Sequence, residues 1–231
     1  RSILSDNSSP GTANPFRGPA GIALDAANGR ALVADKSQGA LLAVDLTTGV
    51  RTLLSGRVTP DDTNPLFSPL GIAVDPANDR ALVVSNGQPG LLAVDLQTGA
   101  RTLVSTNATP DAVNPFSGPI GIALDSANNR ALIVDNVRDS VLAVDLQSGV
   151  RTILSNATTP DAVSPFTSPV GIALDSANNR ALVVDNLLAT AFAVNLQTGT
   201  RTVLSNATTP DAANPFSGPA GIALDSANNR A

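Results

Sequence analysis

The chain has 231 residues, a net charge of −5, and no Cys, His, Met, Trp or Tyr. All 19 acidic residues are Asp, because Glu is absent, and Lys36 is the single lysine. This alphabet excludes disulfides, thiolate zinc sites and His-dependent catalytic triads. An acidic chain with 3% aromatic residues also lacks the basic surface and the stacking platforms that bind nucleic acid, so we expect no nucleic-acid partner.

The apolar runs are short, for example residues 31–34, so none can span a bilayer and we expect no membrane insertion. With 42% hydrophobic residues the chain can nevertheless fill a core. The sequence begins without an initiator Met or a signal peptide, which indicates a processed chain or a window on a longer protein.

A repeat of 50 residues dominates the sequence. An Arg-[Ser/Thr]-x-x-Ser pattern starts at positions 1, 51, 101, 151 and 201, and Gly-Ile-Ala-[Leu/Val]-Asp starts 20 residues after each. Only 7 of 31 positions differ between residues 101–131 and 201–231. The repeat units are 1–50, 51–100, 101–150, 151–200 and a partial unit, 201–231, or about 4.6 repeats.

Each unit contains four short apolar runs, which the third repeat shows at residues 121–125, 131–135, 141–146 and 152–155. Their length and their β-branched and aliphatic residues predict strands rather than helices. The runs are nearly continuous rather than alternating, which is typical of a sheet covered on both faces.

The connections between these runs predict an antiparallel meander. Residues 126–130 and 147–149 form short turns whose Asn and Gly tolerate positive φ, whereas residues 136–140 form a looser link. The longer loop at 109–119 contains three prolines, so it cannot be a central strand. Three short connections followed by one long crossover are typical of a β-propeller blade.

The predicted fold is therefore all-β: a single β-propeller over residues 1–231, built from four-stranded antiparallel blades of 50 residues about a central axis. A β-solenoid is the competing repeat fold, although its coils are usually shorter and lack hairpin turns.

Residues 119–135, which read Pro-Ile-Gly-Ile-Ala-Leu-Asp-x5-Ala-Leu-Ile-Val-Asp, and the following Leu-Ala-Val-Asp-Leu resemble the NHL and TolB-like β-propellers. The resemblance covers every full repeat. It implies six blades as the commonest number, and closure of the ring by pairing a terminal strand with strands from the other end. Residues 1–5 would be a fourth strand of the kind that such a closure needs.

Strand direction places the link between the second and third strands at the same rim as the crossover, and the two tight turns at the opposite rim. These links are the least uniform part of the repeat, so we expect binding residues there. The candidates are Lys36, Gln38, Gln88, Arg138, Asp139, Leu187 and Leu188. The last two form either an exposed apolar spot suited to protein contact or a locally buried loop.

Several recurring residues are better explained by the architecture than by binding. Asp25 and Arg30 flank the first turn and recur in every repeat, so we expect an ion pair that braces the turn; a ring of ligand-binding arginines is the alternative. Asp35 and Asp45 end strands, as do most of their counterparts, and should accept hydrogen bonds from turn amides.

Phenylalanines recur in the crossover, at Phe16, Phe116, Phe166 and Phe216, and the pattern shifts at Leu66-Phe67. We expect them to anchor the crossover to the core. An aromatic rim for ligands is the alternative.

Calcium is the sharpest metal hypothesis, because Asp, Asn and carbonyl oxygens are hard ligands and Asp61-Asp62 is the only adjacent acidic pair. No D-x-D-x-D-G loop is present, so we expect no cofactor. A nucleophile would have only Asp or Lys36 as a base. Gluconolactonase-like propellers resemble this fold, but their metal site includes a Glu, which this chain lacks.

These observations favour a non-enzymatic scaffold for protein binding or self-assembly. The Cys-free, acidic composition suits an extracellular or cell-surface location. The alternative is a Ca²⁺-dependent hydrolase or lyase of the gluconolactonase-like type.

A ring needs whole blades, yet the last repeat stops at residues 230–231, as its second strand begins. The sequence is then a window on a longer propeller, a ring with a defective blade, or a chain completed by another copy. Open strand edges invite such pairing, so we predict self-association through the terminal strands.

Overall fold

The computed structural model describes residues 2–8, 10, 13–60, 62–88, 90–210, 213–228 and 230–231. In this part of the chain, all regular structure consists of β-strands and short 3₁₀ turns, as predicted. The described residues contain no helix that is long and apolar enough to cross a bilayer.

The strands form four four-stranded antiparallel sheets, which we number as blades one to four. Blade one contains β1 (Pro19–Asp25), β2 (Arg30–Asp35), β3 (Ala40–Asp45) and β4 (Arg51–Ser55). Blade two contains β5 (Pro69–Asp75), β6 (Arg80–Ser85), β7 (Gly90–Asp95) and β8 (Arg101–Thr106). Blade three contains β9 (Pro119–Asp125), β10 (Arg130–Asp135), β11 (Ser140–Asp145) and β12 (Arg151–Ser155). Blade four contains β13 (Pro169–Asp175), β14 (Arg180–Asp185), β15 (Thr190–Asn195) and β16 (Arg201–Ser205).

In every blade the strands follow one another in sequence order, so the predicted meander is confirmed. Each blade takes its fourth strand from the start of the next sequence repeat. The boundaries of a blade therefore differ from those of the 50-residue sequence repeat: blade one, for example, runs from Pro19 to Ser55. A blade's outer strand and the crossover that follows it share one repeat.

The tight turns have the conformations that their residues predict. The first turn of each blade is a 3₁₀ turn, at η1 (Ala26–Asn28), η2 (Pro76–Asn78), η3 (Ser126–Asn128) and η4 (Ser176–Asn178). The residue after each has positive φ, for example +61° at Gly29 and +49° at Asn129. Gly49, Gly99, Gly149 and Gly199 have φ of 72–74° in the second tight turn. Glycine and asparagine tolerate this conformation at low cost.

The two rims of each blade are arranged as strand direction predicts. The link after β2 contacts the crossover, since the Lys36 amide donates to the Gly18 carbonyl at 2.9 Å. At the other rim the two tight turns contact each other, since the Leu46 amide donates to the Gly29 carbonyl at 3.0 Å. The same pair of contacts occurs in the other three blades.

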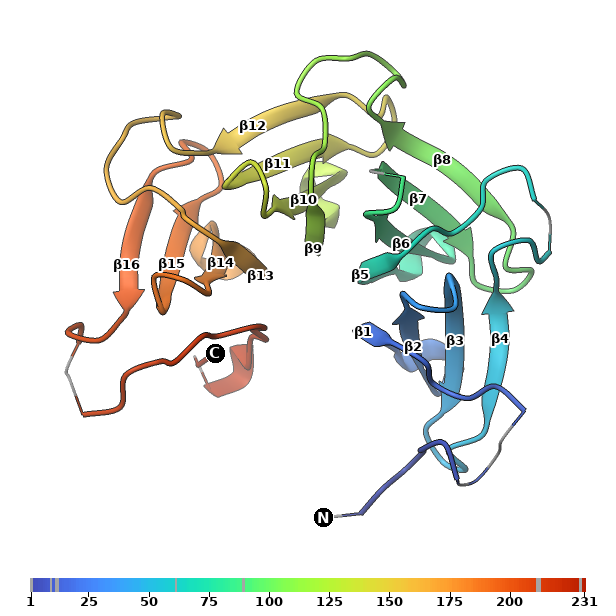
Figure 1. The fold of residues 1–231 in the computed structure, drawn as a ribbon. Helices are drawn as coiled ribbons and strands as arrows, with labels where there is room; N and C mark the ends of the chain where they lie inside the picture. The colour runs from blue at the N-terminus through green and yellow to red at the C-terminus, as the bar shows by residue number, and fades with distance from the viewer. Residues whose placement is uncertain are drawn as a thin grey trace. The chain divides into compact units, whose positions relative to one another are not determined.

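The chain divides into two compact units, Arg1–Thr106 and Asn107–Ala231, each with two complete blades (Figure 1). In the first unit, Leu32, Leu41 and Ala43 of blade one pack against Ile72 and Val83 of blade two. Strands β1 and β2 contact β5, whereas the described residues show no comparable contact between the outer strands β4 and β8. Sheets that meet at their inner strands and separate at their outer strands are arranged as propeller blades are.

The second unit repeats this packing. Leu132, Val141 and Ala143 of blade three face Ile172 and Val183 of blade four. In blade four Phe192 takes the position that Leu42 has in blade one, and its ring meets Phe166 edge-on, with centroids 5.4 Å apart. Each contact between blades buries apolar side chains from two sheets, which explains the continuous apolar runs in the sequence.

The crossover phenylalanines are core anchors in the two central cases. Phe116 and Phe166 are buried, and Leu66 fills the same position in the second repeat. Phe16 is half-buried, and Phe216 is 41% exposed, so the prediction is wrong for the last copy. The partial repeat that contains Phe216 forms no sheet that could cover it.

The predicted terminal strands do not form. Residues 2–5 are outside any strand, and Arg1 lies outside the described residues. Residues 219–225 correspond to β13, but an isolated bridge between Asp225 and Arg230 is their only described pairing. A strand needs a neighbour for its backbone hydrogen bonds. Neither segment has the partner that β3 gives to β4 or β14 gives to β13.

The packing between blades predicts a large difference between two isoleucines at equivalent positions. Ile72 is 7% exposed and Ile22 is 70% exposed. We expect Ile72→Ala to lower the free energy of unfolding by about 2–5 kcal/mol, because it leaves a cavity between two sheets. Ile22→Ala should change it by less than about 0.5 kcal/mol. Denaturant unfolding measures both, and equal losses would contradict the assigned interface.

Candidate binding surfaces

The links between the second and third strands form what we call the variable rim: residues 36–39, 86–88, 136–139 and 186–189. All seven candidate binding residues lie on it. Each link begins with a backbone hydrogen bond to the crossover of its own blade. The links therefore vary in side chains on a shared backbone framework, and their binding role stays a prediction.

In the first unit, the candidates differ in how free their side chains are. Lys36 and Gln88 are exposed. Gln38 is engaged within the fold, since its Nε2 donates to the Pro15 carbonyl at 2.7 Å and to an Asp35 carboxylate oxygen at 3.0 Å. Gln38 therefore braces the crossover, and a ligand would have to displace these two bonds.

In the second unit, the variable rim exposes apolar side chains. Leu187 is 70% and Leu188 is 43% exposed, so these residues form an exposed spot rather than a buried loop. Val137, at the position of Leu187 in the preceding blade, is 68% exposed. Comparison of the repeats at this position could have identified Val137 from the sequence. Arg138 lies beside it and donates through Nε to Ser117 Oγ at 3.0 Å.

Asp139 is the one acidic residue among the residues that define the variable rim. Burial raises the pKa of its carboxyl, and the negative charges of Asp185 and Asp135 raise it further. Its Oδ1 and the neighbouring Ser140 Oγ are buried without a hydrogen-bond partner among the described residues.

The metal candidates are not brought into a cluster. Asp61 lies outside the described residues, and Asp62 is exposed in the crossover before β5. Within the described ranges, no three acidic side chains are grouped so that they could hold a metal ion. Calcium binding stays an untested hypothesis.

The strand-end aspartates accept amide hydrogens, as predicted. Asp35 accepts from the backbone amides of Arg17 at 2.7 Å, and of Gly18 and Gln38 at 3.0 Å. Asp135 and Asp185 make the corresponding bonds in the second unit. Each carboxylate joins its crossover to the link after the second strand, and so fixes the backbone of the variable rim.

The turn ion pairs are also as predicted. Arg30 Nε lies 2.7 Å from Asp25 Oδ2, and the four counterparts have distances of 2.7–2.8 Å. Arg30 also donates to the Leu96 carbonyl of the next blade at 2.6 Å. Arg130 makes the equivalent bond to the Leu196 carbonyl at 3.1 Å. These arginines brace the first turn, and Arg30 and Arg130 also join two blades.

A second set of recurring arginines has a structural role that was not predicted from the sequence. Arg51, Arg101, Arg151 and Arg201 start the fourth strands and are almost completely buried. Arg201, for example, donates to Ser155 Oγ at 2.6 Å and to the carbonyls of Ser164, Asp161 and Val163 at 2.8–2.9 Å. Burial lowers the pKa of Arg151 and Arg201. The recurrence of Arg directly before the apolar run of each fourth strand was the sequence signal that could have predicted this role.

These arginines hold the crossover against the outer strand of the following blade. Arg201 also lies over the Phe166 ring, 5.4 Å from its centroid, and Arg151 stands equally far from the Phe116 ring. Crossover carbonyls that would otherwise be buried and unpaired thereby receive donors. The crossover needs this device because its prolines remove backbone donors.

One apolar face was not predicted from the sequence. It is the face of blade one that bears Ile22, Ala31, Val33, Val44 and Leu46, which we call the open face. Ile22 and Leu46 are exposed there, whereas Ala31, Val33 and Val44 are buried and Phe16 packs against them. The same face of blade two is covered by blade one. Leu46 is 40% exposed, whereas Leu96 at the equivalent position is 3% exposed.

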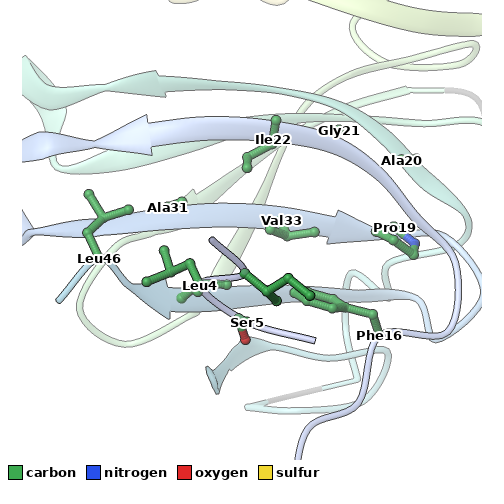
Figure 2. A pocket seen from close by; sticks show the side chains of 12 residues that line it. Leu4, Ser5, Phe16, Pro19, Ala20, Gly21, Ile22, Ala31, Val33 and Leu46 are labelled. Carbon is green, nitrogen blue, oxygen red and sulfur yellow. The ribbon is translucent and has the colours of Figure 1, made fainter. Parts of the chain in front are cut away.

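A cavity of about 530 Å³ lies on the open face (Figure 2). Figure 2 shows Ile22 and Val33 on neighbouring strands of the sheet, and Leu4 and Phe16 beside the strand that carries Val33. Its lining is mostly apolar and consists of Ile3, Leu4, Ser5, Phe16, Pro19, Ala20, Gly21, Ile22, Ala31, Val33, Val44 and Leu46.

No known protein family and no curated protein matches this sequence. Solved structures do resemble it. One, a nidogen/laminin complex, gives a TM-score of 0.71 at 20% identity over 91% of this chain and 70% of that one. An auxiliary nutrient-binding protein from Bacteroides ovatus gives 0.67 at 15% identity, over 91% of this chain and 55% of that one. A Bacteroides thetaiotaomicron protein of unknown function gives 0.56 at 14% identity, over 97% and 70%.

At these identities the likeness establishes the fold. Together with the four meander sheets, it shows that the chain is built of β-propeller blades. The closer resemblance to NHL and TolB-like propellers, and the number of blades in a closed ring, stay predictions.

The buried arginines predict a specific loss of stability. We expect Arg151→Met to lower the free energy of unfolding by at least about 3 kcal/mol, because it leaves several buried carbonyls without donors. Arg138→Met removes one exposed hydrogen bond and should cost less than about 0.5 kcal/mol. Denaturant unfolding compares the two variants, and similar costs would show that the buried guanidinium does not hold the crossover.

The strand-end aspartates predict a pH dependence. Burial alone would raise the pKa of Asp35, but the amides of Arg17, Gly18 and Gln38 and the Gln38 side chain lower it below its usual 3.8. Asp35 therefore stabilises the fold above that pH, and its contribution is lost as the pH falls through the lowered pKa.

We expect Asp35→Asn to be less stable than the unsubstituted chain at pH 6, and the difference to shrink toward pH 2. Unfolding free energies measured across this range test the sign. A difference that grows at low pH would contradict the assigned bonds.

Proposed function

We propose that this chain is a non-enzymatic β-propeller scaffold that binds protein and assembles with copies of itself, outside the cell or at its surface. The observation that carries the proposal is the open face of blade one. Ile22 and Leu46 are exposed on this face, and Ile3 and Leu4, which line the same cavity, are exposed too. Exposed groups of apolar side chains are typical of interaction sites.

The chain itself displays the kind of surface that fits the open face. In the first unit, Leu32, Leu41 and Ala43 of blade one cover Ile72 and Val83, which occupy the same positions as Ile22 and Val33. In blade four the equivalent positions hold Leu182, Ala191 and Ala193, which are buried, and Phe216 and Ile222 of the partial repeat line the same pocket as Leu182 and Ala191. In the proposed head-to-tail contact the open face of one copy replaces the partial repeat on blade four of another, and such a contact extends into chains of molecules unless it closes.

The variable rim supports a second contact surface, for other proteins. Val137, Leu187 and Leu188 are exposed, and the charged Arg138 directly follows Val137 in the sequence. An apolar centre with polar neighbours is typical of protein interfaces. Two structures with this fold, the nidogen/laminin complex and the nutrient-binding protein, are described as assembling or binding proteins, in keeping with this reading.

No observation favours the alternative of a metal-dependent hydrolase or lyase. Lys36, the one candidate base besides Asp, is exposed on the variable rim. The extracellular or cell-surface location rests on the composition, which is acidic and free of cysteine.

Self-association through the open face is directly measurable. We expect sedimentation velocity to show a mass that rises with protein concentration. Ile22→Asp should lower the association constant at least tenfold, because it places a charge at the centre of the contact. Ile22 is exposed in the single chain, so this variant should remain folded, as a thermal melt would confirm.

Val58→Asp is the matched control. Val58 is 64% exposed in the crossover after β4 and is not part of the open face. This variant should associate like the unsubstituted chain. A strictly monomeric chain at all concentrations, or equal effects of the two variants, would contradict the proposal.

A further inference from the structure

Blade two departs from the other three blades at the end of its second strand. Asp35, Asp135 and Asp185 end the second strands of blades one, three and four, whereas Ser85 ends that of blade two. Each of the three aspartates is buried and accepts hydrogen bonds from two crossover amides and from one amide of the link that follows the strand. These three blades therefore contain a carboxylate-binding site that the chain itself fills.

The corresponding donors of blade two have no carboxylate to bind. They are the backbone amides of Phe67, Ser68 and Gln88, and none of them has an acceptor among the described residues. Ser85 is buried like the aspartates, but its hydroxyl donates to the Phe67 carbonyl instead of accepting from these amides. Blade two thus keeps the donors of the site and lacks the group that they bind elsewhere.

Two identical side chains show what the carboxylate does in blade one. Gln38 and Gln88 occupy the same position in their links. Gln38 donates through Nε2 to an Asp35 carboxylate oxygen at 3.0 Å and to the Pro15 carbonyl at 2.7 Å. Gln88 is exposed, and its side chain has no hydrogen-bond partner among the described residues. A carboxylate at this position is therefore an acceptor that holds the glutamine against the crossover.

A cavity of about 170 Å³ lies beside these groups in blade two. Ser85, Gln88 and Gly90 line it, and Leu92 and Leu103 give it an apolar wall. The described residues that line it include no charged side chain. Because an apolar cavity of about 150 Å³ holds a benzene molecule, this one has room for about six non-hydrogen atoms.

Gly90 is the second departure from the repeat at this place. The other blades have Ala40, Ser140 and Thr190 at the same position. In blade three the equivalent cavity, which Ser140 lines, has only about 40 Å³. Two substitutions that occur only in blade two therefore open one space.

The crossover backbone of blade two also differs here. Ser68 has a φ of +53°, in the left-handed region that favours glycine, whereas the equivalent residues of the other three blades have no positive φ. In this conformation the Phe67 carbonyl accepts from the Ser85 hydroxyl and from the Gly87 amide. Backbone strain of this kind persists only where the surroundings hold it, and it is frequent at ligand sites.

We propose that blade two binds a small monocarboxylate in this cavity, at the position that corresponds to the Asp35 carboxylate of blade one. The carboxylate of the ligand accepts from the Phe67 and Gln88 amides in charge-assisted hydrogen bonds. The Gln88 side chain turns inward and donates to it, as Gln38 does to Asp35. This site is separate from the open face and independent of the proposed assembly function.

The rest of the cavity fits the remainder of such a ligand. A short apolar chain attached to the carboxylate lies against Leu92 and Leu103. The peptide between Phe67 and Ser68 rotates when the ligand binds, so that the Ser68 amide joins the donors and its φ leaves the left-handed region. The relief of this strain then contributes to the affinity, because a ligand shifts a conformational equilibrium through its differential interaction with the two states.

A titration of the full chain with butyrate tests the site, at an ionic strength held constant with NaCl. Two-dimensional ¹⁵N–¹H NMR should show saturable shifts of the Phe67 and Gln88 amide signals. The Arg17 and Gln38 amides are the internal control, because Asp35 already occupies their site. Their signals should stay in place. Butyramide has nearly the same shape without the charge and should produce no saturable shift.

Three variants separate the site from a general effect of the acid. Ser85→Asp supplies the carboxylate from the chain itself and should weaken butyrate binding at least about tenfold, because the donors are then occupied. Ser85→Ala leaves the cavity and its donors and should bind butyrate as the unsubstituted chain does. Gln88→Ala changes an exposed residue and should weaken binding at least about threefold, since it removes a hydrogen bond to a charged group. The same spectra show whether each variant is folded.

A free short-chain acid and the C-terminus of a peptide present the same chemical group. Titration with N-acetyl-Ala-Ala, which has a free C-terminus, distinguishes these sources, and the tighter of the two ligands identifies the one that fits. No saturable shift with butyrate, equal shifts with butyramide, equal shifts at Arg17 and Gln38, or unchanged binding by a folded Ser85→Asp variant would each overturn the proposal.

Discussion

The apolar contact between the faces of consecutive sheets is the interaction on which the rest of this structure depends. Each blade is a small sheet with two apolar faces, and a sheet of this kind is stable in water only when both faces are covered. The second and third strands of one blade cannot bury their side chains by themselves. Leu32 and Leu41 become core only because Ile72 and Val83 lie against them. The stability of each blade therefore depends on the blade packed against it, as in other repeat proteins.

Much of this fold is predictable from the sequence because its determinants are local and repeated 50 residues apart. The meander follows from run lengths and turn residues, and the Asp25–Arg30 pair follows from a five-residue spacing across one turn. The buried arginines were not predicted as crossover anchors because their partners are remote. Arg101 binds Ser55, 46 residues earlier, and only the packing of the crossover along β8 brings the two together.

The candidate site was less predictable than the fold. Variation between repeats pointed to the links after the second strands, and the structure places these links at the rim of the crossover. Variation gave no information about which of their side chains are engaged within the fold. Gln38 is engaged by Pro15 and Asp35, whereas Leu187 is free of such contacts and exposed. The open face was not predicted at all, because Ile22 and Ile72 have the same sequence context and differ only in what lies beside them.

That difference gives the terminal segments their significance. Residues 2–5 and β4 have closely similar sequences, yet only β4 is a strand, because β3 supplies its ladder. The conformation of a segment in this protein is therefore decided by its neighbour more than by its own residues. The same holds for single side chains, since Ile72 is 7% exposed where blade one covers it and the equivalent Ile22 is 70% exposed. Binding at the open face would thus use the same packing that holds one blade against the next, which is why its specificity can be read from the interior of the chain.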